Sequence, residues 1–493
     1  MKKIFITIIV IVAISGACTI AVIAGEATNN GHPLIFKNRD ITNWDTEFKV
    51  LTPDGYYAYV INSYYGSSSP WMGINEVGFG IVQSAAYNID YEGGWGLGNA
   101  TLMEFALKRC ETIAEFETIL DSTDITGRST GANYAVIDAH DGAAMFEVAN
   151  WEHLKYEPDS LGIVVRANYS YIGDDGRTGI ERYNRAYRLL GDAALGDSLD
   201  ALFVANHLIA DLYREGEDPY PLPWTGAFDG LPAGWVNTGS DGAETISNWK
   251  SLASCIAQGV SPDMPQELAL MWCCFATPAV SIPFPIFPAS HTQPDECIGN
   301  PSVMLELTHA KYDSAFTDGS NEEWFDTRYL LDETGSGIWN YILPTTAWAF
   351  DTVEIVISSW IDSPPSALEM AEFQDTVMQR ILHSYMTGTG LVVNQHSLLE
   401  TFAINAYPNP FNTSCRIHLS GFSEQGIKIE IFDLSGTLRL RSVPSTHRSL
   451  NGAETTTDRE FIWQPDESIS SGTYFIKVTA GAKSAMKQVI FLK

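Results

Sequence analysis

The hydrophobic pattern of the chain divides it into four regions. Residues 4–24 are almost continuously apolar. Short apolar runs separated by turn residues follow to about residue 190, which predicts strands joined in hairpins. From about residue 191 to 390, apolar residues recur at helical spacing, for example in 197–213 and 367–386. After about Glu400, short alternating strands return and predict a separate antiparallel β-sandwich.

The first hairpin begins inside the apolar run. A strand from Cys18 is followed by a turn at residues 29–31, Asn-Asn-Gly, and by a second strand that ends in residues 37–40, Lys-Asn-Arg-Asp. The turn residues tolerate a positive φ, which suits a hairpin. We therefore expect the second strand to bring Lys37 and Asp40 back beside Cys18.

The segment before Cys18 has the parts of a secretory signal peptide. Two lysines follow Met1, residues 4–14 form the apolar centre, and Ser15-Gly16-Ala17 offers small residues for cleavage. Cleavage after Ala17 leaves Cys18 as the first residue of the mature protein. The expected signal peptide therefore comprises residues 1–17.

Two other interpretations of the apolar run remain open. Residues 4–24 are just long enough to span a membrane, which takes roughly 20 apolar residues. A lipoprotein signal also ends in a cysteine, although Ser15 stands where an aliphatic residue is usual. We favour cleavage, because Ser15-Gly16 interrupts the run and the part after Cys18 is β-branched, as in a buried strand.

The charge of the chain narrows the classes of partner. It has 60 acidic and 29 basic residues, for a net charge of −31. Such a surface repels phosphate backbones, so no nucleic-acid partner is expected. Hydrophobic residues make up 45% of the chain, enough for a large packed core.

The seven cysteines form no metal-ligand pattern. No CxxC pair occurs, and the spacing of His291, Asp295, Glu296 and Cys297 matches no trusted site, so no metal and no cofactor are predicted. Apart from Cys18, six cysteines remain, an even number that is compatible with disulfides in an exported protein. Buried free thiols are the equally plausible alternative.

A cysteine at a mature N-terminus can act as a nucleophile without a catalytic histidine. Its α-amine has an ordinary pKa of about 7.7–8.0, against about 8.5 for the thiol. The amine can therefore accept the thiol proton at neutral pH, directly or through water.

The order of motifs after Cys18 resembles N-terminal-nucleophile (Ntn) hydrolases with a cysteine nucleophile. The resemblance is to the acyl-CoA:6-aminopenicillanate acyltransferase-like group and, more distantly, to choloylglycine hydrolases and cysteine dipeptidases. It covers roughly Cys18 to Leu190, and a later strand pair at residues 271–288 fits the same domain. The motifs are the run from Cys18 to Asp40, the Gly-x-Asn-Glu-x-Gly hairpin in 70–88, the hairpin in 131–150, the strand ending at Asn168, and the helix in 179–190.

The resemblance implies a role for each matching residue. Cys18 matches the nucleophile, with its amine as the general base, and Asp40 matches the carboxylate that orients the amine. Asn168 matches the asparagine whose side-chain N–H faces the developing oxyanion. Arg182 matches a buried arginine near the nucleophile, with Arg185 as a close competitor.

The chain departs from choloylglycine hydrolases at two positions. Lys37 stands where those enzymes have an arginine, and lysine lacks a planar bidentate contact. Their second oxyanion asparagine aligns near Ala85, although Asn88 is close by. Bile-salt specificity is therefore not expected.

The last ninety or so residues resemble the C-terminal sorting domains of the type IX secretion system. The resemblance rests on the Tyr-Pro-Asn-Pro-Phe-Asn string from residue 407 and on the strands that follow it to Lys493. It implies export across an outer membrane, with secretion machinery as a partner. A carbohydrate- or protein-binding β-domain is the alternative.

Together these observations predict an α+β protein of two domains. Residues 18–395 are expected to form a four-layer α/β/β/α Ntn-hydrolase sandwich, and residues 396–493 a linker and a small Ig-like antiparallel β-sandwich. The expected function is extracytoplasmic cleavage of a linear amide or short peptide, or transfer of its acyl group, through a Cys18 thioester. The alternative is a non-catalytic surface lipoprotein or ligand-binding protein with the same fold. After signal removal, no stable membrane span is expected.

Overall fold

A computed structural model gives the structure of the chain. It forms two compact units, Met1–Leu391 and Val392–Lys493, and each is described by itself. The predicted signal peptide, residues 1–17, lies outside the described residues. The structure describes residues 18–90, 93–213, 234–239, 245–316, 324–332, 334–388, 403–407, 411–420, 428–433, 438–442, 459–465, 469–480 and 483–493.

A six-stranded antiparallel sheet carries the predicted first hairpin. Every residue of β1 (Cys18–Ile23) and β2 (Leu34–Asp40) is buried, because these strands lie inside the sheet and both of its faces are covered. The chain between them is longer than a tight turn: it includes a 3-10 turn at Gly25–Ala27, and Gly31 adopts a φ of 78°. In spatial order the strands are β12 (Ile163–Arg166), β1 (Cys18–Ile23), β2 (Leu34–Asp40), β14 (Ser251–Gln258), β15 (Leu270–Phe275) and β16 (Phe284–Ile286).

A seven-stranded antiparallel sheet packs face to face with the first one. Strands β1 and β2 contact β6 and β9 across the interface, so the apolar inner faces of both sheets share one core. The predicted hairpins of residues 70–88 and 131–150 are confirmed as β5–β6 and β9–β10. The strands in spatial order are β11 (His153–Tyr156), β10 (Ala143–Val148), β9 (Ala132–Ile137), β6 (Gly80–Ala85), β5 (Met72–Asn75), β4 (Tyr59–Tyr64) and β3 (Thr46–Leu51).

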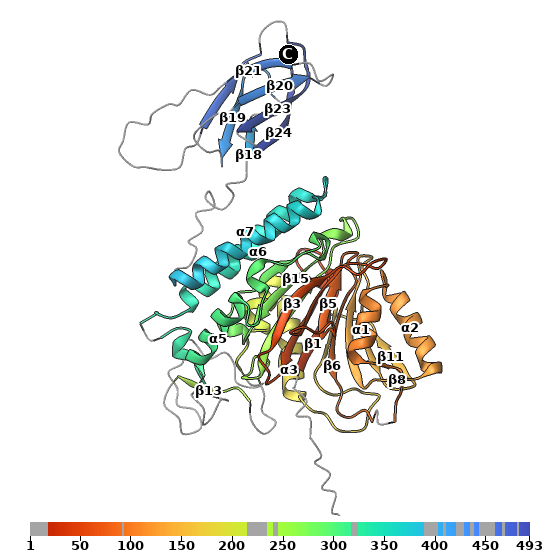
Figure 1. Ribbon diagram of the computed structural model, residues 1–493. Coiled ribbons are helices and arrows are strands. Elements are labelled where there is room, and N and C mark those ends of the chain that lie inside the picture. The colour runs from red at the N-terminus through yellow and green to blue at the C-terminus, as the bar shows by residue number, and fades with distance from the viewer. Residues whose placement is uncertain are drawn as a thin grey trace, which may run out of the picture. The chain divides into compact units, whose positions relative to one another are not determined.

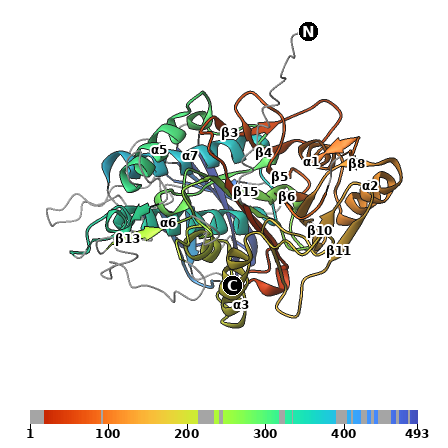
Figure 2. The same cartoon turned by 90° about the horizontal axis from the view of Figure 1, so that it is seen from below.

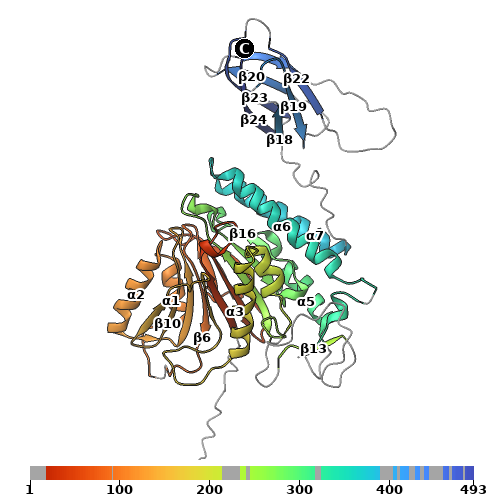
Figure 3. The same ribbon diagram turned by 180° about the vertical axis from the view of Figure 1, so that it is seen from behind.

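Helices cover the two outer faces. Helices α1 (Asn99–Leu107) and α2 (Ile113–Thr126) contact the seven-stranded sheet, and they lie on one side of the unit in Figures 1 and 2. The opposite sheet is contacted by α3 (Ile180–Leu195), α5 (Val303–Ala315) and α7 (Ala367–Thr387); α7 pairs with α6 (Trp339–Trp360), as Figure 3 shows from behind. The predicted four-layer α/β/β/α sandwich is confirmed.

Local sequence explains where the helices start and how long they are. Both α2 and α7 begin with a capping box, Thr112 with Glu115 and Ser366 with Glu369, which satisfies free N–H groups of the first turn. The helix predicted at 367–386 matches α7. The helical spacing at 197–213 yields only α4 (Ala201–Phe203) and a π-helical turn at Val204–Leu208. The described residues of this unit also include four short strands: β7 (Leu97–Gly98), β8 (Arg128–Ser129), β13 (Trp235–Asn237) and β17 (Trp324–Asp326).

The C-terminal unit is a small antiparallel β-sandwich, as predicted. Buried residues from both of its sheets form one cluster that includes Ile417, Ile431, Trp463 and Val478. One sheet contains β18 (Ala403–Tyr407), β19 (Cys415–Ser420) and β22 (Arg459–Trp463). The other contains β20 (Lys428–Asp433), β21 (Leu438–Ser442), β23 (Gly472–Ala480) and β24 (Lys483–Phe491).

Helices that could cross a membrane were sought among the described residues, and none is both long and apolar enough.

A buried asparagine closes the β5–β6 hairpin. Asn75 Oδ1 accepts from the main-chain N–H groups of Val77 and Phe79, at 3.2 and 2.9 Å. Its Nδ2 donates to the carbonyls of Leu107 and Cys110 at 3.0 and 2.9 Å, at the end of α1. This single side chain therefore fixes the turn and attaches α1 to the sheet.

We predict that Asn75→Ala lowers the free energy of unfolding by about 2–3 kcal/mol, because it leaves buried main-chain groups without partners. Urea unfolding measures the loss. Asn43→Ala, at an exposed asparagine that accepts one local hydrogen bond, is the control and should change stability little. Equal effects of the two substitutions would contradict this account of Asn75.

Candidate active site

Cys18 lies between two polar residues at one end of β1. In the antiparallel pairing of β1 with β2, its Cα lies opposite Arg39. On its other side, the pairing with β12 aligns Ile20 with Arg166, and Asn168 follows two residues further on. Directly opposite residues share a face. Because Arg39 bonds Asn62 of the seven-stranded sheet, the Cys18 side chain faces the interface between the sheets.

The main chain of Cys18 is held at both its nitrogen and its carbonyl oxygen. The nitrogen donates to Asn168 Oδ1 at 2.7 Å. Arg182 Nη1 donates to the Cys18 carbonyl at 2.5 Å and to Thr19 Oγ1 at 2.8 Å, and its Nη2 donates to Asn168 Oδ1 at 2.9 Å. The predicted residues Cys18, Asn168 and Arg182 therefore form one buried hydrogen-bonded group.

These bonds fix which way the Asn168 amide points. Its oxygen must face Cys18 and Arg182, because both of those partners are donors. Its Nδ2 donates to the Ala85 carbonyl at 2.9 Å, which uses one of its two N–H groups. Asn168 thus positions the Cys18 nitrogen, and the oxyanion role remains a prediction that would use the second N–H.

Gly179 makes room for Arg182 at the start of α3. It caps the helix with a φ of 80°, in the left-handed region that favours glycine. A Cβ at this position would lie 2.4 Å from Arg182 Nη2 and 2.9 Å from the Ala167 Cβ. The helix can therefore bring the guanidinium to Cys18 only if residue 179 has no side chain.

Arg185, the alternative to Arg182 as the arginine near the nucleophile, has a different partner. Arg185 Nε and Nη2 donate to the two oxygens of Asp211 at 2.9 and 2.8 Å, in a buried bidentate pair. Burial raises the pKa of Asp211 to about 6, and the Arg185 charge opposes that shift. Of the two arginines, Arg182 is the one that bonds Cys18, while Arg185 joins α3 to the segment that contains Asp211.

Asp40 lies on the other face of β2 from the Cys18 side chain. It directly follows Arg39, and successive side chains of a strand point to opposite faces. Its Oδ2 accepts from Asn248 Nδ2 at 2.8 Å and its Oδ1 from Ser251 Oγ at 2.5 Å. These bonds hold the buried carboxylate at the end of β2 that lies beside the start of β1.

Two cations share the face that carries the Cys18 side chain. Lys37 is fully buried and donates from Nζ to the Gln83 carbonyl on β6. Burial lowers the pKa of Lys37, whereas the negative charge of an ionised Cys18 raises it. The second cation is Arg39, which the sequence analysis did not single out. The alternation of β2 was the available signal, because it puts residues 37 and 39 on one face.

Asn88, the asparagine considered for a second oxyanion role, lies in the loop after β6, and its side chain already makes hydrogen bonds there. Asn88 Nδ2 donates to the carbonyls of Ser170 and Asp174, each at 2.7 Å. Its Oδ1 accepts from the Ser170 main chain at 2.9 Å. Asn88 therefore holds the loop that follows Asn168.

All seven cysteines are buried and none forms a disulfide, so the alternative of disulfides is not realised. Cys255 and Cys273 lie directly opposite each other on β14 and β15 and are still unpaired. Burial raises the pKa of Cys255 to about 12 and that of Cys273 well above its ordinary value. These two thiols are therefore packing residues.

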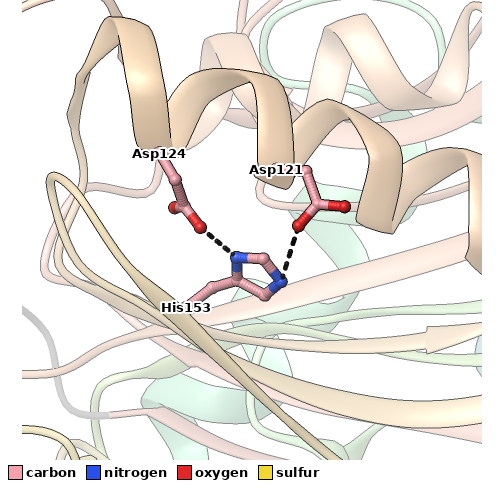
Figure 4. A group of neighbouring side chains, drawn as sticks. All are labelled: Asp121, Asp124 and His153. Atoms are coloured by element: carbon pink, nitrogen blue, oxygen red, sulfur yellow. Dashed lines mark hydrogen bonds and ion pairs between the residues drawn. The ribbon is translucent and has the colours of Figure 1, made fainter.

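One cluster of potential metal ligands lies away from Cys18, where α2 meets β11. His153 Nδ1 contacts Asp124 Oδ2 at 2.8 Å, and its Nε2 lies 3.9 Å from Asp121 Oδ1 (Figure 4). The buried Arg128 guanidinium forms an ion pair with the other oxygen of Asp124. Because this cation already neutralises the carboxylate, we interpret the cluster as an ion-pair network that attaches α2 to the sheet.

Comparisons with known proteins identify the C-terminal unit. Residues 405–492 match the family model described as a secretion system C-terminal sorting domain. The predicted type IX sorting domain is confirmed, and the chain is an exported or cell-surface protein that interacts with secretion machinery. No curated protein matches the chain.

Solved structures with a related arrangement were also found. Two are single-residue variants of conjugated bile acid hydrolase from Clostridium perfringens. They are 11% and 12% identical, cover 52% and 55% of this chain and 89% and 92% of their own, and give TM-scores of 0.34 and 0.35. A third is the Caenorhabditis elegans ortholog of N-acylethanolamine-hydrolyzing acid amidase, 13% identical over 39% of this chain and 89% of its own, with a TM-score of 0.28.

We predict that Arg185→Met makes stability depend more strongly on pH. The folded-state pKa of Asp211 is already raised, and removal of Arg185 raises it further. An acid with a raised folded-state pKa destabilises the fold as pH rises from its unfolded pKa of about 4 through the folded value. The melting temperature should therefore fall more at pH 8 than at pH 5.

The double variant Arg185→Met, Asp211→Asn is the control, since it also removes the buried carboxylate. It should lose the added pH dependence that the single variant shows. If both variants respond to pH alike, Asp211 is not the group responsible.

Proposed function

We propose that the mature protein begins at Cys18 and is an exported cysteine Ntn-type hydrolase that cleaves a linear amide. The observation that carries the proposal is the hydrogen bond from the Cys18 nitrogen to Asn168 Oδ1 at 2.7 Å. It would hold a free α-amine beside the thiol of the same residue. Substrates of this class are small-molecule amides or short peptides.

The first step is attack by the Cys18 sulfur on the amide carbonyl. The α-amine takes the thiol proton, and the new S–C bond gives a tetrahedral intermediate with a negative oxygen. For the amine to act as base, Asn168 Oδ1 must accept one of its N–H groups and leave the lone pair for the proton. The bond from Arg182 to the Cys18 carbonyl fixes the rotation of the residue about its own main chain.

Hydrogen-bond donors around Cys18 would stabilise the negative oxygen of this intermediate. The second N–H of Asn168 is one candidate for the oxyanion, and the Lys37 ammonium, on the same face of the sheet as the thiol, is another. Removal of one such donor costs about 10²–10³ in rate in other enzymes. Asp40 would act from the other face, as a negative charge near the α-ammonium that forms.

The second step releases the amine and then the acid. The α-ammonium gives its proton to the leaving nitrogen as the C–N bond breaks, and a thioester remains on Cys18. Water then attacks the thioester and gives one proton to the α-amine. As the C–S bond breaks, the sulfur takes that proton from the α-ammonium and becomes the thiol again, and the acid is released. Outside the cell acyl-CoA is scarce, so water is the more plausible acceptor than a CoA-dependent transfer partner.

The first prediction of this proposal concerns the mature N-terminus. Mass spectrometry of the secreted protein should find an unmodified Cys18 as the first residue. An acylated Cys18 would instead indicate the lipoprotein, and retention of residues 1–17 would leave the Cys18 nitrogen in a peptide bond, unable to act as a base. Either result excludes the mechanism.

The second prediction concerns the nucleophile. Cys18→Ala should abolish turnover of a panel of linear amides, and the melting temperature should stay within a few degrees, because the side chain is small. Cys415→Ala, at a buried thiol of the C-terminal unit, is the matched control and should retain activity. Full activity of Cys18→Ala would refute the mechanism.

A further inference from the structure

Arg39 is a buried cation that uses only one of its three side-chain nitrogens in hydrogen bonds to described residues. Its side chain is 1% exposed. Nη1 donates to Asn62 Oδ1 at 2.7 Å and to Thr46 Oγ1 at 3.3 Å. Nε and Nη2 have no hydrogen-bond acceptor among the residues that the structure describes. An unsatisfied buried donor is costly, and more so when it is charged, so this arginine needs a functional explanation.

The two unused nitrogens lie on one edge of the guanidinium. Nε–H and Nη2–H point the same way and form the fork that matches the two oxygens of a carboxylate. Arg185 shows this pairing in the same unit, since its Nε and Nη2 bond both oxygens of Asp211. In Arg39 the same edge lacks a carboxylate among its described neighbours.

Two aromatic rings lie against the Arg39 guanidinium, and they also contact each other edge to face, with ring centres 6.0 Å apart. The Arg39 Cζ lies 4.5 Å from the centre of the Tyr64 ring and 4.6 Å from that of Trp71. Both aromatic residues are half-buried, whereas Arg39 is buried. The buried Trp71 Nε1 also has no acceptor. Three N–H donors without acceptors therefore gather in one place, and that set favours an anion.

The electrostatic surroundings support the same conclusion. Burial lowers the pKa of Arg39 to about 10, and the shift is opposed by Tyr64, through its charge and the proximity of its hydroxyl, and by Cys18. Neither group is a carboxylate. The Tyr64 hydroxyl lies outside normal hydrogen-bond geometry to Nε and Nη2. The second cation on this face, Lys37, adds positive charge. An anionic ligand would offset the burial of both charges.

We propose that the substrate carries a carboxylate close to its scissile amide, and that this carboxylate binds the Nε–Nη2 edge of Arg39, beside Tyr64 and Trp71. The proposal rests on the proposed function, in which Cys18 is the nucleophile. Cys18 and Arg39 are directly opposed in an antiparallel pair, where Cβ atoms are about 4.5–5.5 Å apart. Because the two side chains share this face, we expect the carboxylate and the attacked carbonyl to lie close together in the substrate. N-acylated amino acids and half-amides of short dicarboxylic acids meet this requirement.

Binding to the exported Cys18→Ala protein tests the site without turnover. The probes are N-acetyl-L-alanine, with its carboxylate on the amine side, and N-methylsuccinamic acid, with its carboxylate on the acyl side. Each is compared with its neutral methylamide by isothermal titration calorimetry. We expect at least one acid to bind at least tenfold more tightly than its methylamide. In Cys18→Ala, Arg39→Gln that ratio should fall to about one.

Two further variants separate charge from geometry and folding. Arg39→Lys keeps the charge but lacks the fork, so the ratio should be intermediate. Arg109→Gln removes an exposed arginine that also lies over two aromatic rings, Tyr56 and Phe105, and should leave the ratio unchanged. Melting temperatures show whether each variant is folded.

The outcomes distinguish this inference from the proposed function. Equal binding of acids and methylamides, or an unchanged ratio in Arg39→Gln, overturns the carboxylate site and indicates that ordered water satisfies Arg39. If the wild-type enzyme hydrolyses neutral amides as fast as acidic ones, the hydrolase stands and this inference fails. If Arg39-dependent binding is found but no probe is hydrolysed, the anion site stands and the proposed function fails.

Discussion

The arrangement of the candidate site depends on the hydrogen bonds that hold the main chain of Cys18 at both ends. Asn168 binds its nitrogen and Arg182 binds its carbonyl, and Arg182 also binds Asn168. These contacts join β1, the segment after β12 and helix α3, although Cys18 and Asn168 are 150 positions apart in the chain. A residue fixed at both its nitrogen and its carbonyl has little freedom to rotate. A nucleophile and a base on one residue require that restriction to keep a constant geometry.

The alternation of β2 divides the chemistry between two faces of one sheet. Lys37 and Arg39 point to the interface between the sheets, where the Cys18 side chain lies, whereas Asn38 and Asp40 point to the outer face. On that outer face Asn38 donates to the carbonyls of Ile209 and Ile246, at 2.9 and 2.8 Å. Lys37 and Arg39 thus supply positive charge on the face of the thiol. Asn38 and Asp40 make hydrogen bonds to neighbouring segments on the other face. A one-residue shift of register would exchange these roles.

Much of the fold could be predicted from local pattern, and the geometry of the site could not. The strand that ends at Asp40 and the helix α7 follow from alternation, helical spacing and capping residues, which are local signals. Whether Arg182 or Arg185 reaches Cys18 depends on the rotation of α3 and on Asp211, which is distant in sequence. The orientation of the Asn168 amide depends on Ala85, on another sheet. The alternation of β2 puts Arg39 on the same face as Lys37, but it does not show that a charged residue there will be buried beside Cys18.

The negative net charge of the chain limits how a carboxylate site at Arg39 could attract its ligand. With a net charge of −31, the protein as a whole repels anions, so long-range steering cannot favour an acidic substrate. Repulsion between exposed charges is screened beyond about 8–10 Å at physiological salt, whereas a contact with a buried guanidinium is screened much less. Selection of an anion would therefore occur only once the ligand contacts Arg39. Arg39, held by Asn62 and Thr46 before the ligand arrives, presents its free edge with little further loss of freedom.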